Sequence, residues 1–180
     1  MRIIAGTLKG RRLKSPSWDG LRPTSDKVRE TLFNILAQRI AGARVLDGYA
    51  GTGAMGIEAL SRGAAQVMFV DRDRRATALI EANLAACGVR QGYTIDCREV
   101  VAALRGMPVG GDFDVVLLDP PYDIDNVRAL LDAAGARLAP GGLLVLERAT
   151  RRDPEVPVSL VRERDVTSGD STLTFLTRHP

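Results

Sequence analysis

The stretch VLDGYAGTGAMG, residues 45–56, decides the fold of this chain. It begins as an apolar run that ends in Asp47, and it continues with Gly51, Gly53 and Gly56 in the spacing G-x-G-x-x-G. Such a run is typical of a buried strand, and glycine lets the following backbone turn sharply and approach a ligand. The stretch therefore predicts a strand, a glycine-rich turn and the start of a helix. The turn either covers a ligand or is a tight connection without one.

The chain around this turn alternates between short apolar runs and helical stretches from Arg44 onward. All but the last two runs are apolar without alternation, which is typical of a parallel sheet with helices on both faces. The last two runs, 159–166 and 171–178, are separated by a hairpin-length turn and should pair antiparallel. We therefore predict an α/β fold, a mostly parallel sheet ending in an antiparallel hairpin. The earlier strands are expected at 44–47, 66–71, 93–96, 113–119 and 143–147, and the helices at 54–62, 74–87, 98–104 and 126–138.

Two short segments, 2–5 and 11–14, precede this pattern and should form a small hairpin through a turn that contains Gly6 and Gly10. Pro23-Thr24-Ser25-Asp26 then offers the cap and the acidic first turn of a helix that should pack on the sheet. On this helix, Arg29 and Glu30 either face a cofactor bound at the glycine-rich turn or form a structural pair. Its apolar face is predicted to consist of Val28, Leu32, Ile35, Leu36 and Ile40.

The net charge of +3 conceals an asymmetry. Residues 1–44 carry ten Lys or Arg against three Asp or Glu, which is +7, whereas residues 45–180 carry fifteen against nineteen, which is −4. A basic excess in one segment indicates either a surface that binds a polyanion or a solvated basic face. We predict a basic extension over 1–22 and a second unit over 23–180.

The 180 residues are enough for one globular domain with a sizeable core, and 45% of them are hydrophobic. With no apolar run long enough to span a bilayer and no signal-peptide pattern, the chain is expected to be cytoplasmic, with no membrane or metal partner. Cys87 and Cys97 lack metal-ligand spacing and should be reduced core residues.

The acid at the end of the first strand distinguishes two kinds of ligand. In a dinucleotide site the first glycine follows the strand almost directly, and the pyrophosphate lies on the helix N-terminus. Here Gly48, Tyr49 and Ala50 separate Asp47 from Gly51. A carboxylate at this position suits a positive amino group and repels a pyrophosphate. The loop therefore favours the methionyl end of S-adenosylmethionine.

Acids also end the next two predicted strands. Asp71 is placed to accept hydrogen bonds from both ribose hydroxyls of a cofactor, although an acid there could instead cap the following helix. Asp73 is the better candidate for that cap. Asp96 is placed to accept a hydrogen bond from the exocyclic amine of adenine, or its side chain stabilises the turn after the strand. Our predicted cofactor site consists of Asp47, Tyr49, Ala50, Gly51, Gly53, Asp71, Arg72, Asp96 and Cys97.

The sequence LLDPPYD, residues 117–123, ends a buried strand with an acid, two prolines and a tyrosine. This strand should lie beside the first, so that DPPY overhangs the crevice where ligands of open α/β sheets bind. The prolines make the loop stiff. A nucleobase amine is a weak nucleophile, and acceptors on its N–H bonds would direct its lone pair toward an electrophile. The carboxylate of Asp119 and the carbonyl of Pro120 can supply them, and Tyr122 offers a face for stacking. We predict Asp119, Pro120, Pro121 and Tyr122 as the catalytic residues of an enzyme that methylates a planar base amine, without distinguishing guanine from adenine.

Together with the spacing of the other motifs, DPPY makes the chain resemble the RsmD family, bacterial 16S rRNA guanine-N2 methyltransferases. The resemblance runs from Arg2 to about Arg178. Gly48-Tyr49 departs from the Leu-Phe that is common in the family, and Asp96-Cys97 from Asp-Ala. The matching segments are RIIAG at 2–6, GRRL at 10–13, LRPTSDKVRETLFNIL at 21–36, LDGYAGTGAMGIEALSRGA at 46–64, FVDRD at 69–73 and DPPY at 119–122.

The resemblance implies a Rossmann-like class I S-adenosylmethionine-dependent methyltransferase fold and methyl transfer to N2 of one guanine in 16S rRNA. The substrate would be the assembled or assembling small ribosomal subunit, and the enzyme a monomer. The predicted RNA-binding residues are Arg2, Lys9, Arg11, Arg12, Lys14 and Arg22.

Three rival hypotheses remain at this point. A DNA or other RNA amino-methyltransferase would share everything after Arg44. A nicotinamide dehydrogenase is disfavoured by Asp47 and DPPY. A ribosome-assembly binding module with a vestigial site is disfavoured because the motif residues are intact.

Overall fold

The computed structural model describes residues 1–16, 18, 26–108, 112–122 and 124–179. In this part of the chain, a seven-stranded sheet has the order β3-β2-β1-β4-β5-β7-β6, in which β1 to β5 are parallel and the last two pairings are antiparallel. The predicted α/β fold and its terminal hairpin are confirmed. The strands are β1 (Arg44–Gly48), β2 (Gln66–Val70), β3 (Tyr93–Asp96), β4 (Phe113–Leu118), β5 (Leu138–Ala149), β6 (Leu160–Ser168) and β7 (Ser171–Arg178). The helices are α1 (Asp26–Ile40), α2 (Ala54–Ser61), α3 (Arg74–Cys87), α4 (Val100–Gly106) and α5 (Val127–Gly135).

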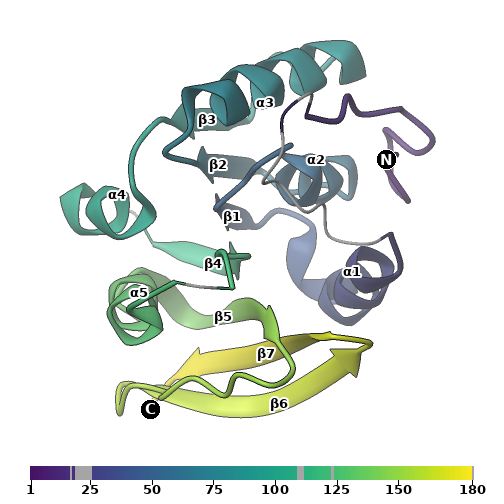
Figure 1. Cartoon of the computed structure of the whole chain (residues 1–180). Helices are drawn as coiled ribbons and strands as arrows, with labels where there is room; N and C mark the ends of the chain where they lie inside the picture. The colour runs from purple at the N-terminus through teal and green to yellow at the C-terminus, as the bar shows by residue number, and fades with distance from the viewer. Residues whose placement is uncertain (17, 19–25, 109–111, 123, 180) are drawn as a thin grey trace.

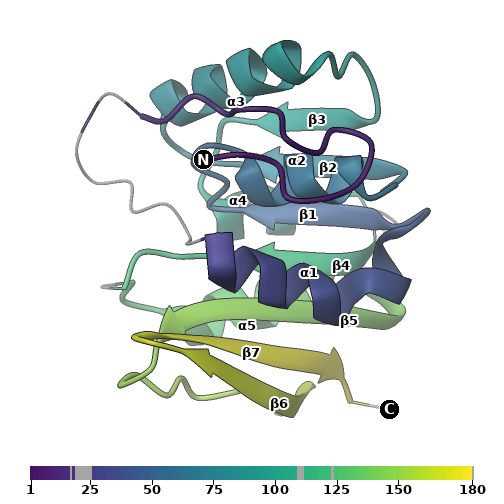
Figure 2. The ribbon, with the colours of Figure 1, turned by 90° about the vertical axis from the view of Figure 1, so that its right-hand side faces the viewer.

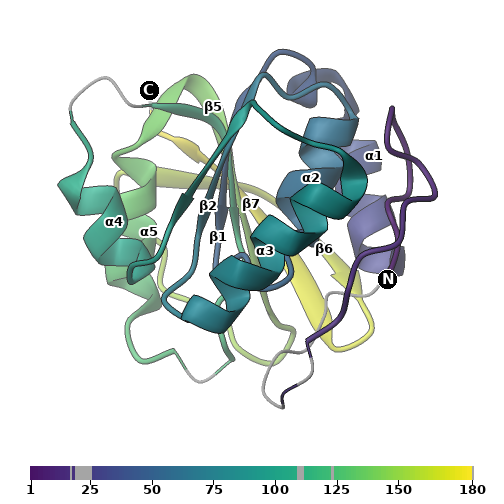
Figure 3. The same ribbon diagram turned by 90° about the horizontal axis from the view of Figure 1, so that it is seen from above.

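The sheet separates two layers of helices (Figures 1 and 3). Helices α1, α2 and α3 cover one face, and α4 and α5 cover the other. Successive strand residues point to opposite faces, so Val45 belongs to the apolar cluster beneath α1 to α3 and Leu46 to the cluster beneath α4 and α5. This burial on both faces explains why the central strands β1 and β4 show no alternation of apolar and polar residues.

The strand order reverses between β1 and β4. The chain winds outward from β1 to β2 and β3, and then returns to place β4 on the other side of β1, with Gly48 opposite Leu118. The N–H of Asp119 faces the Gly48 carbonyl at 3.4 Å. Ligands of open α/β sheets bind beyond the carboxyl ends of the strands at such a reversal, and the predicted placement of DPPY beside the first strand is confirmed.

Helix α1 has the predicted position and apolar face. Val28, Leu32, Leu36 and Ile40 are buried, Ile35 is partly buried, and the helix lies across the sheet near β4 (Figure 2). The proposed cap at residues 23–25 lies outside the described residues. None of the helices in the described ranges is long and apolar enough to cross a membrane.

The predicted N-terminal hairpin is confirmed and is short. An isolated antiparallel bridge joins Arg2 to Arg12, with backbone hydrogen bonds of 2.9 to 3.1 Å between the two segments. The N–H groups of Ile4 and Ala5 donate to the carboxylate of Glu58 on α2, at 2.7 and 3.0 Å. The segment contributes Ile3 to the core beneath α1 to α3.

Candidate active site

The four predicted acidic positions gather at one edge of the sheet. Asp96 ends β3, Asp71 follows β2, Asp47 lies near the end of β1, and Asp119 follows β4. Because these neighbouring strands are parallel, their carboxyl ends meet at the same edge. The structure thus brings together residues from four separate stretches of sequence.

Asp47 is the most deeply buried of these acids, with 3% of its surface exposed. One carboxylate oxygen accepts the backbone N–H of Gly56 at 2.8 Å. Burial raises the pKa of the Asp47 carboxyl from 3.8 to about 8, the Gly56 hydrogen bond opposes the shift, and the charges of Asp119 and Asp71 add to it. A positive ligand group beside Asp47 would favour its charged form.

The loop after β1 adopts backbone conformations that suit a close turn. Gly51 and Gly53 have positive φ angles of 55° and 76°, and Tyr49 shares this conformation at 60°. The following helix packs closely, since a Cβ on Gly56 would lie 2.2 Å from the Phe69 ring. Ala50 is buried and its N–H donates to the Val70 carbonyl at 3.2 Å. The glycine spacing is therefore required both for the turn and for helix packing.

Two backbone N–H groups orient the carboxylate of Asp71. Gly51 donates to one oxygen and Asp73 to the other, each at 2.9 Å. A carboxylate oxygen has two lone pairs, so each oxygen retains capacity to accept from a ribose hydroxyl. The helix cap is Asp73, whose carboxylate accepts the Arg75 N–H at 2.8 Å, as predicted.

The acid and cysteine at the end of β3 lie at the rim of the site. Asp96 is half-buried and binds the Arg98 guanidinium with both oxygens, with contacts of 2.5 to 3.0 Å. Cys97 is exposed, so the prediction of a buried core cysteine holds for Cys87 and is wrong for Cys97. The strand ends at Asp96, which leaves the next side chain above the sheet edge. Arg72 is exposed, and its carbonyl lies 3.8 Å from the Cys97 sulfur.

The Tyr49 ring packs against the apolar cluster beneath α4 and α5. Desolvation, followed by the charge of Glu99, raises the pKa of the Tyr49 hydroxyl to about 12. The side chain of this predicted cofactor residue thus contributes to packing, whereas its backbone forms part of the loop.

The DPPY segment follows β4 as a short, constrained loop. Asp119 is half-buried, Pro120 is buried and Pro121 is exposed. The N–H of Ile124 donates to the Pro121 carbonyl at 3.1 Å and closes a turn. Within this turn, the hydroxyl of Tyr122 lies 3.1 Å from that of Ser171 on β7. The loop therefore carries two prolines and contacts the C-terminal hairpin.

The basic N-terminal segment lies against α2 and α3. Its cations Arg2, Lys9, Arg11, Arg12 and Lys14 are all exposed, and Arg22 lies outside the described residues. An exposed cationic face is what a phosphate-binding surface requires.

Three polar side chains that the sequence analysis missed hold this segment. Glu58 accepts two of its N–H groups, Ser61 accepts the Leu8 N–H at 2.9 Å, and Asn83 exchanges hydrogen bonds with the backbone of Lys14 at 2.7 and 3.2 Å. All three are buried. A single polar residue inside an otherwise apolar helix face is the signal that could have identified them.

Arg29 forms a structural pair and does not join the cluster of strand-end acids. It is fully buried, and its guanidinium donates to the Asp26 carboxylate at 2.8 Å and to the Arg2 carbonyl at 2.7 Å. Glu30 is exposed. Of the two alternatives left open, the structural pair is correct for Arg29, with Asp26 as its acid.

The residues of this edge fit S-adenosylmethionine. A buried carboxylate, which suits a cationic amino group, lies beside the glycine turn, and an oriented carboxylate, which suits ribose hydroxyls, follows β2. Among the described residues, no group of three His, Cys, Asp or Glu side chains could hold a metal ion. Fold and site together define the class, an S-adenosylmethionine-dependent methyltransferase with the class I fold.

Comparisons with known proteins define the family. The model of the family described as "Conserved hypothetical protein 95" matches residues 1–177. Ribosomal RNA small subunit methyltransferase D of Escherichia coli strain K12 is 36% identical over 174 residues, which cover 94% of this chain and 85% of that protein. The Haemophilus influenzae protein of the same name is 34% identical over 173 residues, covering 94% of this chain and 89% of that one. The chain belongs to this family, the RsmD family, as the motifs predicted.

A solved structure agrees with this assignment of fold. A hypothetical protein from Thermus thermophilus superposes with a TM-score of 0.83 at 30% identity, and the match covers 99% of both chains. Because the chain belongs to a family of methyltransferases that use S-adenosylmethionine, the dehydrogenase hypothesis is excluded.

Proposed function

We propose that this chain transfers a methyl group from S-adenosylmethionine to the exocyclic N2 amine of one guanine in 16S rRNA of the small ribosomal subunit. The observation that carries the proposal is the position of Asp119-Pro120-Pro121-Tyr122 at the end of β4, next to Asp47 on β1 and the glycine-rich turn that follows it. The family relatives named for small subunit rRNA support the choice of substrate.

Different residues would bind the three parts of S-adenosylmethionine, which are the amino acid end, the ribose and the adenine. The Asp47 carboxylate would hold the amino acid end, with the backbone of Gly51 and Gly53 beside it. Asp71 would accept the ribose hydroxyls, and Asp96 the adenine amine, with Arg72 and Cys97 at the rim. S-adenosylmethionine, when bound, supplies a methyl group that its sulfonium makes electrophilic.

The DPPY segment would orient the base amine. The Asp119 carboxylate and the Pro120 carbonyl accept the two N–H bonds, so the nitrogen lone pair turns toward the donor. Two consecutive prolines restrict the backbone that holds these acceptors. Tyr122 stacks on the flat base, which is worth about 1–3 kcal/mol in single-strand binders. The methylated nitrogen then loses a proton to Asp119 or to water.

The basic extension would hold the RNA. Its exposed cations Arg2, Lys9, Arg11, Arg12 and Lys14 contact phosphates while an unpaired or extruded guanine enters the site. Arg22 is assigned the same role from the sequence. The buried contacts of Glu58 and Asn83 keep this surface fixed relative to the glycine loop. The enzyme would act as a cytoplasmic monomer, without a metal, on an assembled or assembling subunit.

The decisive experiment is transfer of labelled methyl from S-adenosylmethionine to small ribosomal subunits from cells that lack this gene. The digested RNA is analysed for the modified nucleoside, and Asp119→Ala protein serves as the matched inactive control. We expect N2-methylguanosine in 16S rRNA with the wild-type protein alone. Label in another nucleoside would retain the chemistry and overturn the substrate. Absence of label on subunits, precursors and naked rRNA would favour an assembly module.

A further inference from the structure

The C-terminal hairpin and the connection that precedes it each contact Tyr122 of the DPPY loop. The phenolic hydroxyl of Tyr122 lies 3.1 Å from the Ser171 hydroxyl, and its carbonyl accepts the Arg152 guanidinium at 2.5 Å. Ser171 begins β7, and Arg152 lies in the connection between β5 and β6. Arg152 is 30 positions from the tyrosine along the chain and Ser171 is 49, so the contacts exist only in the tertiary structure.

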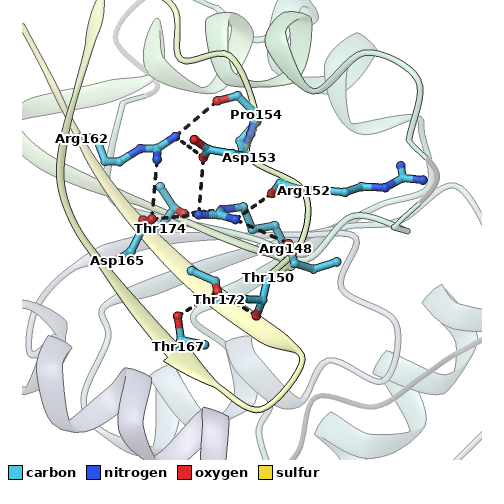
Figure 4. Close-up of polar contacts among 11 residues, drawn as sticks. Arg148, Thr150, Arg152, Asp153, Pro154, Arg162, Asp165, Thr167, Thr172 and Thr174 are labelled. Atoms are coloured by element: carbon cyan, nitrogen blue, oxygen red, sulfur yellow. Dashed lines mark hydrogen bonds and ion pairs between the residues drawn. The ribbon is translucent and has the colours of Figure 1, made fainter.

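A set of polar and charged groups fixes the connection that carries Arg152 (Figure 4). We call this set the Arg148 network, and it consists of Arg148, Arg152, Asp153, Arg162, Asp165 and Thr174.

Arg148 is the centre of the Arg148 network, with 11% of its side chain exposed. Its three guanidinium nitrogens donate to Thr174 at 2.8 Å, to the Arg152 carbonyl at 2.7 Å and to Asp165 at 2.8 Å. Arg162 pairs with Asp153 at 2.7 Å. Because the planar guanidinium binds three partners at once, it holds the backbone at Arg152 against the hairpin.

Hydroxyl groups fix the beginning of β7 in the same way. The Thr172 hydroxyl lies 3.0 Å from that of Thr150 and 3.1 Å from that of Thr167 (Figure 4). The Thr150 N–H donates to the Asp170 carbonyl at 2.8 Å. Ser171 is therefore presented to Tyr122 by a backbone that is bonded on both sides.

We propose that Arg152 and Ser171 are positioning residues, which set the orientation of the Tyr122 ring on which the target base stacks. The inference rests on the proposed function, in which that ring receives the base. A residue held at its carbonyl and at its hydroxyl has little freedom to rotate, and transfer to a base amine depends on alignment of the reacting atoms. The hydroxyl acts through position and takes no part in the proton transfer.

The test is a double-mutant cycle measured as methyl transfer to small subunits. Tyr122→Phe retains the ring and removes the hydroxyl, and Ser171→Ala removes its partner. We expect each to lower kcat about threefold to tenfold, the range for loss of one hydrogen bond. The double variant should lose no more than the larger single effect, because both changes remove the same contact. The KM for subunits and the Kd for cofactor should stay within twofold.

Arg152 is tested separately. Arg152→Ala should lower kcat in the same range, and Arg152→Lys, which retains a cationic donor, should restore at least half of the loss. Matched controls are Arg151→Ala, an exposed neighbour, and Thr177→Val, whose hydroxyl contacts Glu163 at the far end of β7. Both controls should retain the wild-type kcat. Multiplicative losses in the cycle, or equal losses in the controls, would overturn the proposal.

Hydrogen exchange distinguishes failure of this inference from failure of the proposed function. The Ile124 N–H donates to the Pro121 carbonyl, so its exchange rate reports on the loop. Exchange should be faster in Arg152→Ala and Ser171→Ala and unchanged in the controls, whether or not the subunit is the substrate. A wild-type protein that leaves subunits unlabelled would refute the function alone. Unchanged exchange at Ile124 would refute the positioning role.

Discussion

The Asp47 carboxylate, near the end of β1, accepts the backbone N–H of Gly56 in α2 at 2.8 Å. This bond joins the first strand to the helix across the glycine turn and is the main contact that opposes the desolvation of the acid. It therefore links the stability of the turn to the charge of the cofactor site.

The first prediction concerns stability and pH in the protein without cofactor. Because the pKa of Asp47 is raised from 3.8 to about 8 in the folded protein, the folded state retains a proton that the unfolded chain releases between about pH 4 and pH 8. Stability due to this group should fall as pH rises through that window and level off above it. The slope is at most about 1.4 kcal/mol per pH unit.

Asp47→Asn removes this titration and retains an oxygen that can accept the Gly56 N–H. The free energy of unfolding of the variant, measured in urea at pH 5, 6, 7 and 8, should rise steadily relative to wild type. Its Kd for S-adenosylhomocysteine at pH 8 should be at least tenfold weaker, because the carboxylate that we propose for the amino group is lost. Parallel stability curves for the two proteins would contradict a raised pKa of Asp47.

The second prediction separates base orientation from cofactor binding. Asp119→Ala should lower the methyl-transfer rate by at least about 100-fold, the usual effect of removing one acceptor or donor that acts in the transition state. Its Kd for the cofactor should stay within threefold of wild type. Asp125→Ala, an exposed acid of the same loop, is the control and should transfer methyl normally. Equal loss of cofactor affinity in Asp119→Ala would move Asp119 to the cofactor.

The third prediction concerns the attachment of the basic segment. Glu58→Ala removes the acceptor of the Ile4 and Ala5 N–H groups and of the Arg62 guanidinium, which lies at 2.7 Å. Breaking a buried pair of this kind costs about 3–5 kcal/mol. We expect a loss of this size in chemical denaturation.

A readout near the segment checks the same variant. Faster amide exchange at Ile4 and Ala5 in Glu58→Ala would locate the loss at the contact. Glu81→Ala, an exposed acid on α3, should change stability by less than about 0.5 kcal/mol. If Glu58→Ala were as stable as this control, the docking of the segment on α2 would be wrong.

The fourth prediction concerns the RNA surface. Arg11 and Arg12 are exposed on the basic segment, and phosphate contacts determine how steeply affinity falls with salt. The double variant Arg11→Ala, Arg12→Ala should bind 16S rRNA more weakly and reduce the slope of log K against log salt by about 1 to 2. Arg105→Ala on α4, on the opposite face of the sheet, is the control. An unchanged slope in the double variant would place the RNA surface elsewhere.

Local patterns were sufficient to predict the architecture. Apolar runs without alternation, such as 115–118, required helices on both faces, and the four-residue interval before Ser171 required a hairpin. The position of DPPY beside the first strand also followed from the alternation of strands and helices along the chain, because topological rules allow few strand orders in a parallel sheet.

The local arrangement of the N-terminal segment followed only in part from its own residues. Gly6 and Gly10 indicated the hairpin, but the N–H groups of Ile4 and Ala5 bind Glu58, which is more than 50 positions away. A backbone donor takes whichever acceptor the fold brings near, and only the packing of α2 supplies that acceptor. The same reasoning applies to Cys97, whose exposure depends on where β3 ends.

The sequence by itself determined the fold class and the family, and it supplied the candidate cofactor residues, because strand ends, glycine turns and DPPY are contiguous motifs whose chemistry is local. Only the tertiary structure decided which side chains support them. Glu58 holds the basic segment, Asp26 pairs with buried Arg29, and Ser171 and Arg152 hold Tyr122. Such partners are distant in the chain, and a hydrogen bond requires a separation of about 3 Å that spacing along the sequence cannot specify.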